Sequence, residues 1–160
     1  MMIEYKRIGD CDLGRLYDFA SPIWRECYAT MIPSEQIDLL CHKYFDYDNI
    51  VKYIEEGMEY YFIYYNDEKA GFIAYQVQND YVYLDKLYLL KEYRGLHISS
   101  EVFSYLIKEY NKDIVLNVNQ NNKMGLRAYL GKGFKVVETI TYDLGNGLYN
   151  NDFIMRKTKK

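Results

Sequence analysis

Three consecutive stretches of strand-forming residues, separated by two turns, constrain the fold of this chain more than any other feature. Residues 60–65 read Tyr-Tyr-Phe-Ile-Tyr-Tyr, and a run this rich in aromatic and β-branched residues is typical of a strand. Further strands are expected at 70–77 and 81–89, with turns at 66–69 and 79–80. Because such short turns join strands that lie antiparallel, these residues predict an antiparallel meander.

Helical patterns surround the meander in the sequence. Six ranges are expected to be helices: 10–19, 23–30, 34–45, 49–56, 99–110 and 123–132. In 10–19, 34–45 and 99–110 apolar residues recur at helical spacing. Asp10, Ser34 and Asn122 are the expected N-caps. The remaining strands are expected at 2–8, 113–119, 134–143 and 149–156. This order of elements predicts a mixed α/β fold, in which helices pack on a central sheet.

The composition narrows the class of protein. A length of 160 residues predicts a single domain, 1–160. The net charge is −3, so a nucleic acid is not an expected partner, since phosphate binding needs a surplus of positive charge. No apolar run approaches the roughly 18 residues that span a membrane, and the first residues lack a signal-peptide core. We therefore expect a cytoplasmic protein with no membrane partner.

The cysteines and histidines do not indicate a metal site. The three cysteines are an odd number without a CxxC spacing, and only His42 and His97 are available beside them. Neither a disulfide framework nor a bound metal is expected.

Residues 87–100 have the pattern of a strand that passes through a tight loop into a helix. They read Leu-Tyr-Leu-Leu-Lys-Glu-Tyr-Arg-Gly-Leu-His-Ile-Ser-Ser. A helix N-terminus leaves backbone N–H groups unpaired and has a partial positive charge, so such a loop can bind phosphate. One glycine before a helix is common, and this segment alone does not identify a ligand.

A second segment, residues 119–134, follows another expected strand and reads Asn-Gln-Asn-Asn-Lys-Met-Gly-Leu-Arg-Ala-Tyr-Leu-Gly-Lys-Gly-Phe. Together the two segments resemble the signature of the GNAT acetyltransferase superfamily. That signature is an Arg/Gln-x-x-Gly-x-Gly/Ala loop and, further along, an Asn-x-x-Ala-hydrophobic-x-x-Tyr-x-x-x-Gly-Phe helix. Arg94 matches the first position of the loop. The helix motif is matched by Asn122, Leu126, Tyr129, Gly133 and Phe134.

The resemblance extends over essentially the whole chain. The expected order of elements fits the GNAT fold, a twisted, mostly antiparallel sheet that splays at a bulged strand and is flanked by helices. A finer resemblance is to the spermine and spermidine acetyltransferases typified by bacterial PaiA. It rests on five segments: 24–28, 31–37, 86–89, 93–95 and 152–155.

The resemblance implies acetyl-CoA as the co-substrate, without a metal. The backbone of the bulged strand, Leu87, Tyr88 and Leu89, would bind pantetheine. The pyrophosphate would be bound mainly by backbone N–H groups of the loop residues Arg94, Gly95, Leu96, His97, Ile98, Ser99 and Ser100. Asn122 would contact CoA, and Tyr129, nearly two helical turns further on, would lie near the thioester sulfur.

The resemblance also implies direct attack of an amine on the thioester. Tyr129 is the candidate general acid, because its reference pKa near 10 lies within about two units of that of a thiol. Asp85, expected on the same strand face as Leu87, is a candidate base or cation-binding residue. The alternatives are a packing role for Tyr129, an ion-paired surface role for Asp85, and deprotonation of the amine through water.

The expected acceptor is a small-molecule amine, with a polyamine favoured. Trp24 and Tyr28 lie four residues apart on one helical face, and aromatic faces bind ammonium groups. Glu26 would add negative charge. The alternative is that Trp24 and Tyr28 belong to the core.

Three residues depart from the family pattern. Ser99 occupies a loop position that is usually Gly or Ala, and as a small residue it is expected to be tolerated. His97 occupies a loop position that is usually Gly. A negative φ there would cost little strain, and its side chain is expected to face solvent. Gly125 replaces the usual Ala, for which a close backbone approach is one explanation.

Alternative functions remain on the same scaffold. The acceptor in these would be an aminoglycoside, an amino acid or a protein amine. An alternative from a different functional class is a non-catalytic, acyl-CoA-binding regulatory module. His97 at the usual glycine position suggests this class, whereas the presence of Asn122 and Tyr129 argues against it. The sequence does not decide whether the chain forms a homodimer.

Overall fold

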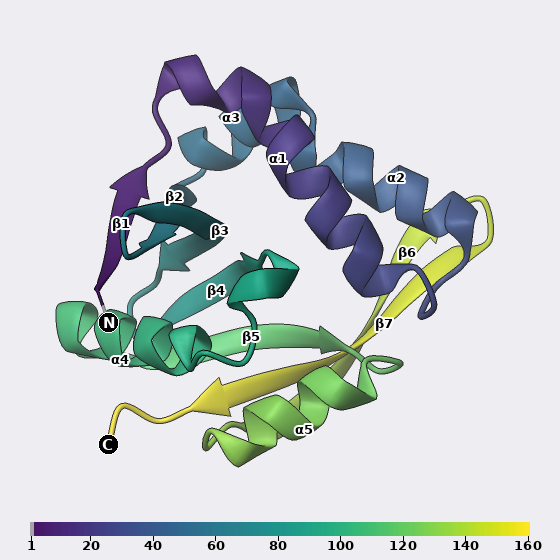
Figure 1. Cartoon of the computed structure of the whole chain (residues 1–160). Helices are drawn as coiled ribbons and strands as arrows, with labels where there is room; N and C mark the ends of the chain where they lie inside the picture. Colours follow the sequence, from purple (N-terminus) through teal and green to yellow (C-terminus); the bar gives the residue numbers. More distant parts are fainter. Residues whose placement is uncertain (1) are drawn as a thin grey trace. The chain divides into compact units, whose positions relative to one another are not determined.

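The computed structural model describes residues 2–160 and has the expected mixed α/β fold, with a seven-stranded, mostly antiparallel sheet and flanking helices (Figure 1). The strands are β1 (Ile3–Arg7), β2 (Glu59–Tyr65), β3 (Glu68–Val77), β4 (Tyr81–Leu89), β5 (Asp113–Asn119), β6 (Lys135–Gly145) and β7 (Leu148–Lys157). The helices are α1 (Asp10–Tyr28), α2 (Ser34–Phe45), α3 (Tyr47–Glu55), the short 3₁₀ helix η1 (Lys91–Tyr93), α4 (Ile98–Tyr110) and α5 (Lys123–Gly131).

The strand order is β1-β2-β3-β4-β5-β7-β6. Strand β2 pairs antiparallel with both β1 and β3, and β7 pairs antiparallel with both β5 and β6. Strands β4 and β5 pair in parallel, with Tyr81–Tyr83 opposite Asp113–Val115. The order and the directions fit the expected GNAT-like sheet.

The chain comprises two compact units. Unit 1 is Met1–Gln76 with Lys86–Ser99, and unit 2 is Val77–Asp85 with Ser100–Lys160. Strand β4 contributes its first half to unit 2 and its second half to unit 1. The expectation of a single domain stays a prediction.

Helix α1 of unit 1 corrects the expectation of two helical pieces separated at Pro22. It is one helix of 19 residues with Pro22 inside it. Pro22 has no N–H to donate to the carbonyl of Asp18, which costs about 3 kcal/mol in a helix interior. Both residues are exposed, whereas Ile23 and Trp24 beside them are buried. Burial of the inner face therefore keeps the helix continuous.

Two of the three expected N-caps are also corrected. The cap of α1 is Gly9 and that of α2 is Pro33, so Asp10 and Ser34 are the first residues inside their helices. Asn122 is the N-cap of α5 as expected, and its side chain accepts a hydrogen bond from the Gly125 N–H at 2.9 Å.

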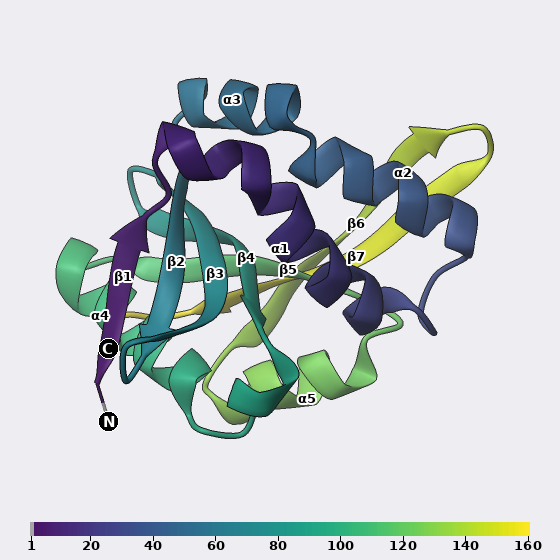
Figure 2. The same cartoon turned by 45° about the horizontal axis from the view of Figure 1, so that its top comes forward.

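The core of unit 1 lies between its helices and its strands. Figures 1 and 2 show α1, α2 and α3 on one side of β1, β2 and β3. Phe19 of α1 packs edge-on against Phe62 of β2, with ring centroids 5.5 Å apart. Phe45 of α2 packs in the same way against Phe72 of β3 at 5.8 Å.

Unit 2 contains the long β6–β7 hairpin, drawn yellow-green to yellow in Figure 2, together with β5, α4 and α5. The turn of this hairpin is at Asn146 and Gly147, which both have positive φ, as such a two-residue hairpin turn requires. The buried apolar side chains of this unit include Val102, Leu106, Ile114, Leu116 and Met155.

Candidate functional site

The second half of β4 holds the expected pantetheine-binding residues, and β3 approaches it closely. A Cβ atom on Gly71 would lie 2.1 Å from the carbonyl oxygen of Tyr88 and 3.0 Å from the Cα of Leu89. Only glycine fits there. The register of β2 and β3 shifts beside Ala70, whose carbonyl accepts the N–H of Leu90 at 2.8 Å. This irregularity is in β3, and a bulge in β4 itself stays a prediction.

The side chains of β4 alternate between a buried and a half-exposed face. Val82, Leu84 and Lys86 are buried, whereas Asp85 and Leu87 are half-exposed. The alternation supports the expected common face for Asp85 and Leu87.

Arg94 connects the loop after β4 to two other elements of unit 1. Its Nε donates to the carbonyl of Leu89 at 3.1 Å, and its Nη1 lies 3.1 Å from the Oε1 of Glu26 in α1. Burial raises the pKa of the neighbouring Cys27 thiol, an effect that Arg94 opposes. In this structure the Arg94 side chain therefore positions the loop, and Glu26 is its ion-pair partner.

The backbone of His97 does not have the negative φ at which a side chain would cost little strain. Its φ is +64°, so the residue adopts the left-handed conformation that suits the usual glycine, at a cost of roughly 1–2 kcal/mol for a side-chain-bearing residue. The side chain is exposed, as expected. Gly95 also has a positive φ, of +79°. Left-handed residues in such a turn direct backbone N–H groups into a concave, anion-binding arrangement.

Helix α4 begins directly after this turn, at Ile98. Ile98 is buried, and Ser99 and Ser100 are half-buried in the first turn. Leu96, just before the helix, is 38% exposed. The residues of 94–100 thus form a turn and a helix N-terminus whose free N–H groups suit a pyrophosphate.

An aromatic cluster lies between α1, α2 and the inner face of β4 in unit 1. The ring of Trp24 stacks at a tilt on Tyr28 with centroids 4.7 Å apart and packs edge-on against Tyr44 and Phe45. Trp24 is only 2% exposed, so it belongs to the core. Tyr28 is half-buried, and its hydroxyl shares a hydrogen bond of 3.2 Å with that of Tyr88. The expected substrate residue Tyr28 thereby contacts the expected cofactor strand.

The same cluster already holds an ammonium group. Lys86, 4% exposed, places its Nζ 4.2 Å from the centroid of the Tyr44 ring and 5.7 Å from that of Phe45. In the sequence, Lys86 stands out only as part of a motif. At these distances both rings contribute a cation–π attraction to the Lys86 ammonium group.

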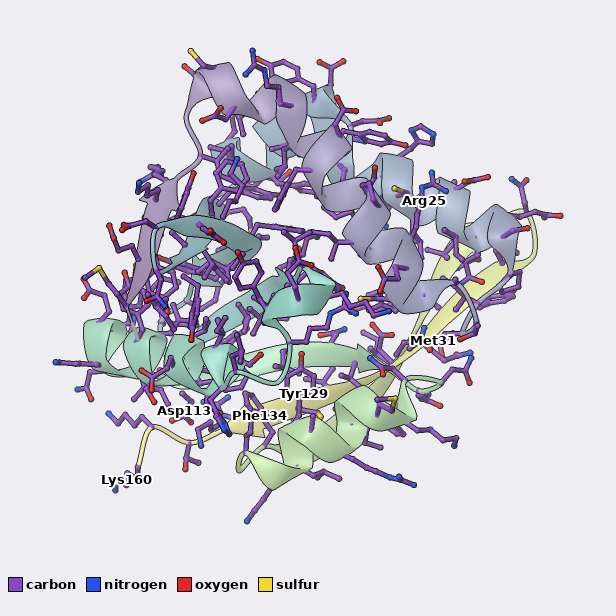
Figure 3. All side chains as sticks on the ribbon, in the orientation of Figure 1. Arg25, Met31, Asp113, Tyr129, Phe134 and Lys160 are labelled. Atoms are coloured by element: carbon purple, nitrogen blue, oxygen red, sulfur yellow. The ribbon has the colours of Figure 1, made fainter. Side chains whose placement is uncertain are left out.

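In unit 2, Tyr129 lies on α5 in an aromatic trio. Figure 3 shows Tyr129 on the helix and Phe134 just beyond its end. The Tyr129 centroid is 5.5 Å from that of Phe134 and 6.1 Å from that of Phe103 of α4. Phe103 and Phe134 are each 1% exposed, whereas Tyr129 is half-buried. The ring is held by packing while part of the side chain stays accessible.

The cap of α5 explains Gly125. A Cβ on Gly125 would lie 2.4 Å from the Nδ2 and 2.7 Å from the Cγ of Asn122. The usual alanine would therefore displace the capping side chain. The Oδ1 of Asn122 is occupied by the cap, which leaves its Nδ2 as the donor for a ligand.

Asp152 is a candidate functional residue that the sequence motifs do not single out, although residues 152–155 contribute to the finer resemblance. Asp152 of β7 is only 7% exposed, and burial raises the pKa of its carboxyl group, against the effect of a hydrogen bond from Asn117. An acidic residue directly before the apolar run 153–155 of an expected strand is the signal that could have found it.

Metal-binding clusters and membrane-spanning helices are both absent from the part of the chain that the structure describes. Residues 2–160 include no group of three or more His, Cys, Asp or Glu side chains placed to hold a metal ion. Within the same residues, no helix is long and apolar enough to cross a membrane.

Comparisons with known proteins agree with the fold and the motifs. A family model described as an acetyltransferase (GNAT) domain matches residues 28–149. The spermidine N(1)-acetyltransferase of Thermoplasma acidophilum is 25% identical to this chain over 166 residues, which cover 98% of each protein.

Among solved structures, the PaiA N-acetyltransferase from Thermoplasma acidophilum, in complex with coenzyme A, has a TM-score of 0.76 at 24% identity over 99% of both chains. Arabidopsis thaliana Naa50, in complex with a bisubstrate analogue, has a TM-score of 0.63 at 21% identity over 99% of both chains. At these identities the structures establish the fold.

Proposed function

Because the chain belongs to the GNAT acetyltransferase family and is an acetyl-CoA-dependent N-acetyltransferase, we propose that its acceptor is a primary amine of a polyamine such as spermidine or spermine. The observation that carries this proposal is the similarity, over 98% of both chains, to a spermidine N(1)-acetyltransferase. The aromatic cluster with Tyr28, which already stabilises the Lys86 cation, supports a cationic acceptor.

Most of the residues that would bind the co-substrate belong to unit 1. Backbone groups of Leu87, Tyr88 and Leu89 would hold pantetheine, and the turn at Arg94–Ser100 would hold the pyrophosphate. The positive φ of Gly95 and His97 and the adjacent N-terminus of α4 support this role, because they leave several N–H groups for an anion. Acetyl-CoA supplies the activated acetyl group as a thioester.

Three side chains of unit 2 and the backbone of β4 would act on CoA and the reacting groups. Tyr129 would donate a proton to the departing thiolate, and Asn122 would donate a hydrogen bond to CoA through its Nδ2. Asp85 would accept a proton from the amine or hold its cation, and a backbone N–H of β4 would stabilise the negative charge that develops on the carbonyl oxygen. The half-buried position of Tyr129, with its ring fixed by two phenylalanines, supports its role.

One pair of measurements tests the proposed function. Thermal unfolding with acetyl-CoA or CoA should show stabilisation, by about 2.7 kcal/mol at a hundredfold excess over Kd, and the absence of any shift would contradict the cofactor role. The values of kcat/KM for spermidine, a monoamine of similar length, an aminoglycoside and a peptide then identify the acceptor. A preference for the aminoglycoside or the peptide would contradict the polyamine proposal without contradicting the acetyltransferase activity.

A homodimer and a cytoplasmic location both stay predictions. Analytical ultracentrifugation of the purified chain would test the first.

A further inference from the structure

A buried carboxylate in unit 2 is surrounded by amide groups. Asp152 of β7 accepts a hydrogen bond from the Asn117 Nδ2 at 3.1 Å and another from the Asn150 Nδ2 at 3.3 Å. No cationic side chain among residues 2–160 is paired with it. Such a carboxylate is costly to bury, and neutral amides offset only part of that cost.

The orientation of both amides is fixed by further partners. The Oδ1 of Asn117 accepts the hydroxyl hydrogen of Tyr83 at 2.9 Å, so its NH₂ group has to face Asp152. The Oδ1 of Asn150 accepts from the Nδ2 of Asn119 at 2.9 Å. The Oδ1 of Asn119 in turn accepts the backbone N–H of Asn121. These donors hold the Asp152 carboxylate in place and in one orientation.

The network reaches the surface at Tyr142. The hydroxyl of Tyr142 accepts a hydrogen bond from the Asn117 Nδ2 at 2.9 Å, and the residue is 38% exposed. Tyr83 connects the network to β4, where Asp85 follows on the same strand face. A cation entering beside Tyr142 would therefore meet the Tyr142 hydroxyl oxygen and the Asp152 carboxylate, the two groups to which the Asn117 amide donates.

A carboxylate of this kind suits an ammonium group that stays charged. An opposite charge nearby raises the pKa of an amine and holds its proton, which would oppose nucleophilic attack by that amine. The pairing is favourable only for an ammonium group that does not react. A polyamine has such a second group, and a monoamine does not.

We propose that Asp152, positioned by Asn117 and Asn150, binds the non-reacting ammonium group of the acceptor and selects diamines and polyamines over monoamines. This inference rests on the proposed function, since it requires an amine acceptor. It adds a specificity-determining residue to that function.

The test compares 1,4-butanediamine with butylamine, which have the same carbon chain. The wild-type protein should have a kcat/KM for the diamine at least about tenfold higher, and Asp152→Asn should lower it at least about tenfold while changing the value for butylamine less than about threefold. The KM for acetyl-CoA should not change. Asp143→Asn is the matched control, since it removes the same charge from an exposed position of the same hairpin.

Asp152→Asn can place its own NH₂ group against the amide donors of Asn117 and Asn150, which could destabilise the fold. Asp152→Ser is therefore the second variant, because the smaller side chain leaves room for water. Thermal unfolding identifies which variant is folded. Equal losses for both amines would assign Asp152 a structural role and overturn the inference, as would an unchanged diamine preference. A wild-type protein that acetylates both amines equally would also overturn it and leave the proposed function standing. Transfer to no amine would instead contradict the proposed function itself.

Discussion

The hydroxyl oxygens of Tyr28 and Tyr88 lie 3.2 Å apart and join helix α1 to strand β4 across 60 positions of the sequence. A hydrogen bond of this kind contributes about 1 kcal/mol to stability. Tyr28→Phe and Tyr88→Phe should each lower the free energy of unfolding by about that amount. Because both changes remove the same bond, the double variant should lose less than the sum of the two. Chemical denaturation of the four proteins measures the coupling.

The same two variants distinguish a structural role of Tyr28 from a role in substrate binding. Under the proposed function, Tyr28→Phe raises the KM for spermidine more than Tyr88→Phe does, because only Tyr28 would contact the acceptor. Identical kinetic effects would restrict Tyr28 to the packing of unit 1.

Gly71→Ala tests the close approach of β3 to β4. The new methyl group would lie 2.1 Å from the backbone oxygen of Tyr88, so one strand has to move. We expect a loss of at least about 2 kcal/mol in stability and a higher KM for acetyl-CoA. Gly14→Ala in α1 is the control, since nothing lies within 4 Å of its Cβ, and alanine there should stabilise the helix by up to about 1 kcal/mol. Equal stability of the two variants would contradict the close approach of the two strands.

His97→Gly removes a side chain from a left-handed residue. Because glycine adopts φ near +64° without strain, stability should stay the same or rise by up to about 1 kcal/mol. The KM for acetyl-CoA should stay the same or fall. His97→Ala keeps the strain and removes the imidazole, so a loss of acetyl-CoA affinity in both variants would show that the ring contacts phosphate.

The fold could be predicted from the sequence because its signals are local. Strand-forming runs, turns and the cap at Asn122 depend on neighbouring residues, and the structure places them within a few positions of the expectation. Pro22 leads to a wrong prediction because its cost is also local, whereas the burial of Ile23 and Trp24 that outweighs it depends on the packing of α1. The family motifs add the resemblance to the GNAT superfamily, which the family model matching residues 28–149 confirms.

The site could be predicted only where it follows a motif. The backbone conformation of His97 is set by the turn between η1 and α4, and no residue type determines it. Whether Trp24 belongs to the core or contacts the substrate depends on its contacts with α2, which the sequence does not show. The surroundings of Asp152 depend on the register of β5 with β7, which brings Asn117 within reach from 35 positions away.

Asp113→Asn tests a pH-dependent contribution to stability. The backbone N–H of Lys159 and the Nε of Arg156 each donate to the Asp113 carboxylate at 2.9 Å, and these contacts hold its pKa below the usual value of 3.8. A carboxyl group with a lowered pKa in the folded state stabilises the protein above the unfolded pKa, and this contribution is lost as the pH falls through the folded pKa.

The wild-type protein should therefore be about 1 kcal/mol more stable than Asp113→Asn at pH 7, a modest value because the pair is partly exposed. The difference should shrink as the pH falls below 3.8. Thermal unfolding across pH measures it, and a difference that grows on acidification would contradict the assignment. Asp143→Asn controls for the change in net charge.

Tyr129→Phe tests the candidate general acid. The change removes one hydroxyl and keeps the ring that packs against Phe103 and Phe134, so stability should change by no more than about 1 kcal/mol. If the hydroxyl acts on the thiolate as charge develops, kcat falls and the KM for acetyl-CoA changes little. General acids contribute about 10²–10⁴-fold, so we expect at least a tenfold loss in kcat. Tyr47→Phe on α3, an exposed position, is the control.

The loss in kcat of Tyr129→Phe should decrease at high pH only if proton donation limits the rate, because a thiol that leaves as the thiolate needs no proton donor. A folded Tyr129→Phe protein with unchanged kcat would make Tyr129 a packing residue of unit 2 and leave Asp85 as the remaining predicted catalytic side chain.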